Sequence, residues 1–320
     1  MNASTVSPYH EGEHYLQSLT GLRDKMEAVG RRVIRELLTD EQQSFFNALS
    51  MLYICSFDDD GLPCAQVVSG TAGFISADDH QLTLDLKRVT GGNQLVFSRE
   101  NNSVGILGLI HDQRKRVRLN GEVTIQQDDT LIIKVVQAFG NCPKYIQARK
   151  VLAPILNDQY AVPEVMKLKR LDQTLKGLVE QVDTFFIGSY YMPQGLKKGQ
   201  GSRDAVASHG VDMSHRGGKP GFISVIDDET LNWPEYSGNF AFNTLGNLMQ
   251  NPVCSLLFID FGTGDVLQLV GRTNLNTDTI ANGNPVKATV EFKLDSGVYS
   301  KQSLPYQWEF MDYSPMLEKL

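Results

Sequence analysis

Gly73-Phe74-Ile75-Ser76 occurs a second time, unchanged, as Gly221-Phe222-Ile223-Ser224. Further matches flank this tetrapeptide in the same order, which argues against coincidence. They pair residues 53–56 with 186–189, 91–93 with 237–239, 105–110 with 254–259, and 117–121 with 267–271. Self-similarity at a long and nearly constant offset is typical of a duplicated structural unit. The sequence therefore predicts an internal repeat, with two copies of one fold in a single chain.

The second copy is longer than the first. The offset between matching residues rises from 133 to 148, so about fifteen additional residues lie between Ser189 and Gly221. This insert is rich in Pro, Gly, Lys and Ser, a composition that predicts a surface loop. Long loops in compact domains often carry function, and the loop from Tyr190 to His209 is a candidate for docking a partner.

Each copy contains short apolar or alternating segments bounded by Gly, Asp and Asn, which is the pattern of a β-barrel. Capping-box residues at 39–42 predict a helix before the first copy, and Leu171, Leu175 and Leu178 have helical spacing before the second. An amphipathic helix is expected over residues 14–38, interrupted near Gly21 or Gly30.

These patterns divide the chain into five segments. They are an N-terminal helical extension (1–38), copy one (39–127), a bridging segment (128–168), copy two (169–275) and a C-terminal strand extension (276–320). The predicted fold class is mainly β, a β-barrel with flanking helices.

Composition excludes several classes of function. Thirty basic and thirty-seven acidic side chains give a net charge of −7, the wrong sign for binding a nucleic-acid backbone. The four cysteines show no C-x-x-C spacing, so neither a zinc site nor a disulfide framework is indicated. Without a leader or a long apolar run, the sequence predicts a cytoplasmic protein with no membrane contact.

Familiar catalytic motifs are missing or misleading. His10-Glu11-Gly12-Glu13-His14 has the letters of the zinc motif H-E-x-x-H. We reject a metal site there because the segment has no recognisable third ligand and contains Gly12 in the supposed helix. No nucleophile elbow, P-loop or dinucleotide-binding glycine motif is found, so hydrolase, P-loop and Rossmann functions have no support.

Two basic regions are candidates for binding an anion. Residues 214–221 place His215, Arg216 and Lys219 among glycines before a strand, and Ser237-Gly238-Asn239 is predicted to open a helix that runs to residue 251. A helix start and an Arg fork suit a phosphate, although a solvated basic turn is the alternative. The matching place in copy one, residues 69–72, lacks the cations, so copy two is the better candidate.

The second region is Arg114, Arg116 and Arg118, which the period of a strand places on one face. An anionic ligand or nearby carboxylates would relieve their repulsion, and an exposed edge strand protected by charge is the alternative. Cys142 beside Lys144 has the composition of an activated thiol, but a structural cysteine before a Pro turn is the preferred interpretation.

Several blocks together resemble a known family, the flavin-nucleotide-binding proteins related to pyridoxamine 5′-phosphate oxidase, which have the FMN-binding split-barrel fold. The blocks span residues 9–13, 116–121, 141–146, 214–218, 220–222, 237–239, 246–247, 251–252 and 256–260. The resemblance implies FMN bound where two split barrels meet. Such barrels usually belong to two chains, whereas the repeat here implies two tandem split barrels forming an internal pseudo-dimer.

The resemblance also implies which residues bind the cofactor. They are Arg116, Arg118, Lys144, Tyr145, Ser214, His215, Arg216, Gly217, Ser237, Gly238, Asn239, Asn243 and Thr244. Asn243 and Thr244 fall where the oxidase has a cationic phosphate clamp, so His215, Arg216 and the 237–239 helix start would have to neutralise the phosphate. Arg116 falls where the oxidase has a Gln beside the flavin ring.

The expected function is therefore a flavin-dependent oxidoreductase acting on a small molecule, with a nicotinamide or similar electron donor. FAD, a deazaflavin and haem are the alternative cofactors, and a non-catalytic flavin carrier or sensor is the alternative function. A monomeric pseudo-dimer or a homodimer is expected, with no nucleic acid and no metal. No catalytic residue and no pyridoxamine-phosphate activity can be assigned from the sequence.

Overall fold

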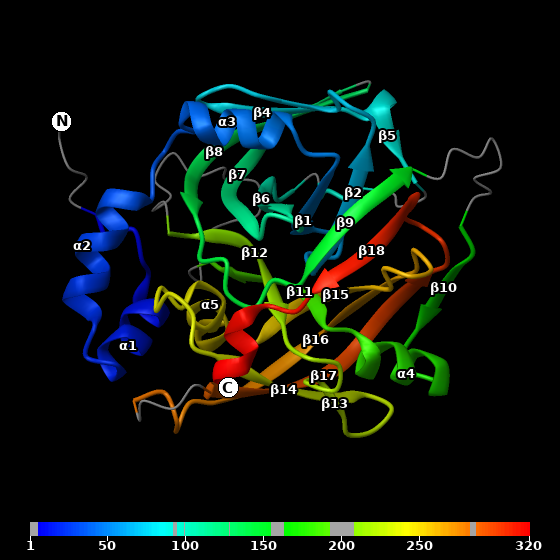
Figure 1. Ribbon diagram of the computed structural model, residues 1–320. Helices are drawn as coiled ribbons and strands as arrows, with labels where there is room; N and C mark the ends of the chain where they lie inside the picture. The colour runs from blue at the N-terminus through cyan, green and yellow to red at the C-terminus, as the bar shows by residue number, and fades with distance from the viewer. Residues whose placement is uncertain are drawn as a thin grey trace.

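A computed structural model describes residues 6–91, 95–98, 100–127, 129–154, 163–192, 208–281 and 286–320. Two large antiparallel sheets curl against each other, with short helices around them (Figure 1). This confirms the predicted fold class, mainly β with flanking helices. Within the described residues, no helix is long and apolar enough to span a membrane.

Each sheet is built from one copy of the repeat, plus neighbouring strands. The first sheet contains β1 (Met51–Phe57), β2 (Pro63–Gly70), β3 (Ile75–Ala77), β4 (Gln81–Asp85), β5 (Val89–Thr90), β6 (Ser103–Ile110), β7 (Lys115–Gln127) and β8 (Thr130–Gly140). The second contains β10 (Val165–Leu168), β11 (Thr184–Tyr191), β12 (Gly210–Gly217), β13 (Ser224–Val225), β14 (Thr230–Tyr236), β15 (Val253–Ile259), β16 (Val266–Asn276) and β17 (Val286–Ser300).

The two sheets have the same strand order. The path β3-β4-β8-β7-β6-β1-β2 in the first sheet corresponds, strand for strand, to β13-β14-β17-β16-β15-β11-β12 in the second. A register shift falls at Asn120/Gly121 in β7 and at the matching place, Val270/Gly271, in β16. A bulge repeated at one position of the same topology is difficult to explain except by duplication, since bulges are specific features of a fold.

The halves meet at a seam between β1–β2 of the first sheet and β11–β12 of the second. Tyr53 and Phe186, which match in the repeat, stack with ring centroids 3.7 Å apart and planes 17° apart. Their successors Cys55 and Gly188 also match, and a Cβ on Gly188 would lie 2.2 Å from the Cys55 sulfur. Contacts between equivalent residues place a pseudo-two-fold axis here. The last strands of the copies, β9 (Ala148–Pro154) and β18 (Tyr306–Asp312), pair with each other.

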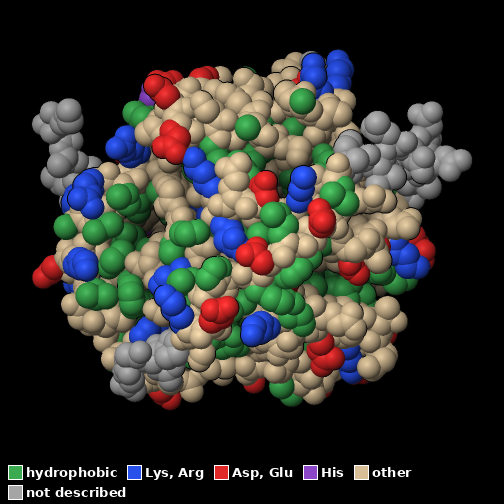
Figure 2. Space-filling model, in the orientation of Figure 1, with side chains coloured by type: hydrophobic (Ala, Val, Ile, Leu, Met, Phe, Trp, Pro, Cys, Tyr) green, Lys and Arg blue, Asp and Glu red, His purple; other side chains and the backbone are tan. Residues whose placement is uncertain are grey.

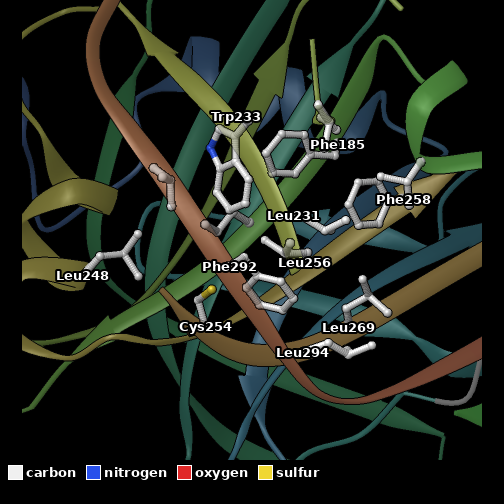
Figure 3. Close-up of a cluster of buried hydrophobic side chains, with 14 of the residues drawn as sticks. Phe185, Leu231, Trp233, Leu248, Cys254, Leu256, Phe258, Leu269, Phe292 and Leu294 are labelled. Carbon is white, nitrogen blue, oxygen red and sulfur yellow. The ribbon is translucent and has the colours of Figure 1, made fainter. Parts of the chain in front are cut away.

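Each half also has its own hydrophobic core. In the second half, Phe185 lies edge-on to Trp233 at 5.2 Å and stacks on Phe258 at 5.5 Å, with Phe292 and Leu231 among the side chains around them (Figure 3). The first core is assembled equivalently around Phe46, Leu52 and Phe74. Burying one such side chain stabilises the folded protein by about 1.5–3 kcal/mol. Each half is therefore stabilised by an apolar core of its own.

The helices at the start of the two copies form where the sequence predicts them. α3 (Asp40–Asn47) starts at a capping box in which Thr39 and Gln42 bond each other's backbone, and α4 (Gln173–Gln181) buries Leu175. The predicted helix over residues 14–38 is two helices, α1 (Glu11–Leu19) and α2 (Arg23–Val33), separated at Gly21, whose φ is +69°. α5 (Asn243–Gln250) packs on α1.

The sheet boundaries differ from the predicted segments. β8 lies in the predicted bridging segment but pairs with β4 and β7, so the first sheet extends to Gly140. β17 lies in the predicted C-terminal extension but is a central strand between β16 and β14. Both strands form by pairing with partners distant in sequence, which local patterns do not encode.

Candidate functional site

A half-open cleft lies on one side of the seam, between β7 of the first sheet and β12, β14 and α5 of the second. Water can occupy about 120 Å³ of it, and the whole space between its walls, including the part open to solvent, is about 850 Å³. The residues lining it are Arg116, Arg118, Asn141, Lys144, Tyr145, Ser214, His215, Arg216, Gly217, Phe222, Pro234, Glu235, Tyr236, Gly238, Asn239, Phe240, Phe242, Asn243, Thr244, Leu245 and Lys287. We call this cavity the cleft.

The structure brings together twelve of the thirteen residues proposed from the sequence to bind a cofactor. The thirteenth, Ser237, contributes its carbonyl oxygen just outside the lining. It accepts hydrogen bonds from the Lys144 ammonium at 3.3 Å and the Tyr145 hydroxyl at 3.0 Å. Residues separated by more than a hundred positions along the chain therefore converge on one cavity.

The lining is strongly cationic. Arg116, Arg118, Lys144, Arg216 and Lys287 line the cleft, whereas Glu235 is the one carboxylate among its lining residues. In a chain with a net charge of −7, this concentration of positive charge is local. A concave site with excess charge of one sign favours a ligand of the opposite sign.

Arg116 has no acidic partner among the described residues, and its Nε is buried without a hydrogen bond. Burial, and next the charge of Arg216, lower the pKa of Arg116 to about 9, so its guanidinium stays charged at neutral pH. Arg116 is half-buried, and a cation partly removed from water without a counter-ion is costly. An anionic ligand in the cleft would supply the missing counter-charge.

Arg118 is held by a buried polar network. Its Nη2 donates to Asp212 at 2.5 Å, and the same carboxylate accepts from Asn120 at 2.7 Å and Asn247 at 2.9 Å. Arg118 Nη1 donates to the Asn243 side chain at 3.2 Å. Since Arg118 and Asp212 come from different sheets, this pair joins the two halves directly behind the cleft.

The N-terminal helix α1 completes that network. Glu13 accepts hydrogen bonds from the Asn243 amide and, at 2.9 Å, from the backbone N–H of His10. Burial, and next the nearby Asp212, raise the pKa of the Glu13 carboxyl well above its ordinary value. His10 also contacts the Asn247 side chain at 2.8 Å. The segment with the letters of a zinc motif therefore caps α1 and fixes α5.

Arg216 is oriented by the core of the second sheet. Glu235 accepts from Arg216 Nε at 2.6 Å and from the indole N–H of Trp233 at 3.0 Å. Trp233 is 1% exposed and packs against Phe185. The carboxylate is thus fixed on its core side, and it holds the guanidinium of Arg216 at the wall of the cleft.

His215 lies in the wall with both ring nitrogens buried and without a hydrogen-bond partner. Burial, and next the charge of Arg116, lower the pKa of its imidazole well below the ordinary value, so the ring is neutral at physiological pH. Buried imidazole nitrogens normally find a partner. A ligand with one donor or acceptor group facing His215 would satisfy one of them.

The predicted helix start at residues 237–239 is wrong. α5 begins at Asn243, because Phe240 and Phe242 both have φ of +62° and the Asn239 side chain accepts from the Ala241 N–H. The residues at the helix start are Asn243, Thr244 and Leu245, all of which line the cleft. Thr244 donates to the Ser214 hydroxyl at 2.9 Å, linking the helix start to β12.

Arg114 does not share the face of Arg116 and Arg118. It precedes β7 with φ of +49°, and its guanidinium donates to Asp312 at 2.5 Å and to the Ile146 carbonyl at 3.0 Å. The strand period therefore does not apply to it.

The sequence predicts a docking loop over residues 190–209. Residues 193–207 of this loop lie outside the described residues.

Aromatic residues of the lining were missed by the sequence analysis. Tyr236, Phe240 and Phe242 line the cleft, and the Tyr236 ring lies 5.2 Å from Tyr145. Phe240 and Phe242 adjoin the proposed 237–239 segment, so their proximity was a usable signal. No sequence signal pointed to Lys287, because it lies on β17, which pairs with β14 although the two strands are far apart in the sequence.

Among the residues that the structure describes, the equivalent place on the other side of the seam has no such lining. The strand pairing shows which residues occupy this second position: Val67 corresponds to His215, Val266 to Arg116 and Gln268 to Arg118. Val67 and Val266 belong to one buried apolar cluster with Leu304 and Tyr306. The Tyr306 hydroxyl donates to the Gly70 carbonyl at 3.2 Å. The chain itself fills this second position.

No family model matches the sequence, and no curated protein matches it. Among solved structures, HupZ of Group A Streptococcus is 13% identical with a TM-score of 0.29, over 42% of this chain and 98% of HupZ. A candidate pyridoxamine 5′-phosphate oxidase of Lactobacillus delbrueckii is 12% identical with a TM-score of 0.28, over 41% and 94% of the two chains.

A Clostridium acetobutylicum protein related to general stress protein 26 of B. subtilis, from the pyridoxinephosphate oxidase family, is also similar. It is 13% identical with a TM-score of 0.26, over 42% of this chain and 89% of its own. Because these TM-scores are low, the function proposed below is argued from the residues of the cleft and not from the similar solved structures.

Proposed function

We propose that the cleft binds FMN and that the protein is a flavin-dependent oxidoreductase acting on a small molecule. The observation that carries the proposal is the half-buried Arg116, whose Nε is buried without a hydrogen bond, beside a neutral, unpartnered His215 in a cationic cleft with aromatic walls. Fixed cations favour a phosphate, and aromatic side chains favour a flat ring system. Both requirements are met in one cavity.

Particular residues have particular roles in this proposal. Arg216, oriented by Glu235, and the helix start at Asn243 and Thr244 bind the phosphate. Arg116 and Lys144 provide positive charge near the ring, and Tyr145 and Tyr236 exclude water from it. FMN, when bound, supplies the hydride and electron chemistry, whereas the protein supplies orientation and electrostatics.

The absorption spectrum of the purified full-length protein, before and after addition of FMN, tests the cofactor. A flavin spectrum retained through gel filtration is expected. A Soret band would assign haem instead, a single band between the flavin pair would assign a deazaflavin, and no retained chromophore would contradict the proposal. Bleaching by NADH or NADPH would support an oxidoreductase, whereas a flavin reduced only chemically would favour a carrier or sensor.

Replacing Arg116 by Ala is expected to weaken FMN binding by about 1.5–3 kcal/mol, or roughly ten- to a hundredfold, because it removes an uncompensated cation from the site. Titration calorimetry measures the change. Lys115→Ala is the matched control, since the neighbouring Lys115 pairs with the exposed Glu41 outside the cleft. Equal FMN affinity in the two variants would remove Arg116 from the site.

One FMN per chain is the expected stoichiometry, although the chain contains two copies of the unit. The second position has Val67 and Val266 in place of His215 and Arg116, and Tyr306 fills it. Burying a phosphate there without cations would be prohibitive. Flavin released from a known amount of protein by denaturation gives the ratio, and a value of two would contradict this assignment.

A further inference from the structure

A second cavity lies between the ribbon formed by β9 and β18 and the second half of the protein. Water can occupy about 310 Å³ of it, which is at the lower end of the range of small-molecule sites. The end of α4 and the turn after β15 complete its walls. Its lining includes Arg149, Asp183, Asp260, Phe261, Trp308 and Phe310. We call this cavity the ribbon pocket. Within the described part of the chain, no residue lines both the ribbon pocket and the cleft.

The walls of the ribbon pocket are largely aromatic. Phe261 and Trp308 lie edge to face with ring centroids 5.1 Å apart, and Phe310 contributes a third ring, which is 46% exposed. Figure 2 shows hydrophobic side chains exposed on this face, in the region where Figure 1 places the β9–β18 ribbon. Aromatic walls with an apolar surround favour a ligand with a flat, apolar body.

Two hydrogen-bond donors in these walls have no acceptor. The Nη1 of Arg149 and the indole Nε1 of Trp308 are buried without a hydrogen-bond partner among the described residues. Both side chains pack on Phe261, because the guanidinium lies 4.4 Å from the centroid of its ring and the indole ring 5.1 Å. The two donors therefore belong to one cluster. Buried donors normally have an acceptor, and a ligand oxygen in the ribbon pocket would supply one.

The charges of the ribbon pocket disfavour an ionic ligand. Arg149 is 7% exposed, and its Nη2 already donates to both carboxylate oxygens of Asp183, at 2.6 and 2.5 Å. Asp260 adds a second carboxylate to the lining, so an anion would be repelled. A cation stacked on the aromatic walls would meet the Arg149 guanidinium, which lies over the rings of Phe261 and Phe310 at 4.4 and 5.6 Å. The pocket therefore suits a neutral molecule with an acceptor oxygen.

We propose that the ribbon pocket binds a neutral aromatic molecule that carries a carbonyl or amide oxygen. The ring of the ligand lies among Phe261, Trp308 and Phe310, and its oxygen accepts from the unpaired donors of Arg149 and Trp308. Both donors are covered in the free protein, so the exposed ring of Phe310 turns to admit the ligand and then packs against it. This site is independent of the cofactor proposed for the cleft.

The test is nuclear magnetic resonance of the full-length protein with isotopically labelled tryptophan, titrated with benzamide. The chain contains two tryptophans, so the spectrum has one indole signal from each. Trp308 reports on the ribbon pocket, and Trp233, whose indole N–H donates to Glu235 at 3.0 Å, is the internal control. We expect benzamide to shift the Trp308 signal saturably and to leave the Trp233 signal in place. Benzoate and benzylamine have the same ring with opposite charges, and each should bind at least about tenfold more weakly.

Two variants of β18 locate the binding. Phe310→Ala should weaken benzamide binding by about fivefold or more, because it removes one aromatic wall. Met311→Ala is the matched control, since Met311 is the next residue of the strand, is 53% exposed and does not line the pocket. A Trp308 signal that does not shift saturably, equal losses in the two variants, or benzoate binding as tight as benzamide would each overturn the proposal.

Discussion

Replacing Asp212 by Ala is expected to destabilise the protein by about 3–5 kcal/mol, because it leaves the charge of Arg118 buried without a partner. Arg118 is 2% exposed and Asp212 is 7% exposed, so water cannot easily replace the lost carboxylate. The substitution also removes the acceptor for Asn120 and Asn247. Urea denaturation followed by far-ultraviolet circular dichroism measures the free energy of unfolding.

A surface ion pair provides the control for Asp212. Asp312 pairs with Arg114 at the same distance, 2.5 Å, but its carboxylate is 60% exposed. Asp312→Ala should therefore cost no more than about 1 kcal/mol. Equal losses from the two substitutions would contradict the view that the Arg118–Asp212 pair is buried and structural.

Replacing both partners tests the mechanism of that loss. Arg118→Met/Asp212→Leu removes the two charges together, so it should be more stable than Asp212→Ala, which leaves one charge behind. The single variant should also regain part of its stability from FMN, because an anion in the cleft faces the orphaned guanidinium and binds only the folded protein. No recovery by either route would mean that loss of packing, not of charge compensation, explains the effect.

Local sequence patterns predict the repeat and the start of α3 well. Gly73-Phe74-Ile75-Ser76 and its second copy lie at the same place in both sheets, and the capping box at Thr39 starts α3. Such signals depend on a few adjacent residues, so a single sequence contains them. The central position of β17 depends instead on pairing with β14 and β16, which no local pattern specifies.

The candidate site is predictable to the extent that its residues cluster in the sequence. Ser214 to Gly217 are consecutive on β12 and all line the cleft. Arg114 shows the limit, because one residue with a left-handed backbone turns its side chain toward Asp312. The compensation of Arg118 by Asp212 was not predictable, since the pair joins different sheets across 94 residues.

Replacing Tyr53 or Phe186 by Ala is expected to cost about 3–5 kcal/mol each, because both rings are fully buried and each substitution leaves a cavity at the seam. Since the rings stack on each other, the double variant should lose less than the sum of the single losses. The difference should be about 0.5–1.5 kcal/mol, the coupling typical of an aromatic pair. Thermal and urea unfolding of the four proteins in the cycle give this value.

Phe185 supplies the control for this cycle, because it adjoins Phe186 in sequence but packs on Trp233 in the core of the second half. Tyr53→Ala and Phe185→Ala should be additive within about 0.5 kcal/mol. Additive losses from Tyr53 and Phe186 as well would contradict a tight seam on a pseudo-two-fold axis. The cleft takes Arg116 from one half and His215 from the other, so loosening the seam should also lower FMN affinity in both single variants, although neither residue lines the cleft.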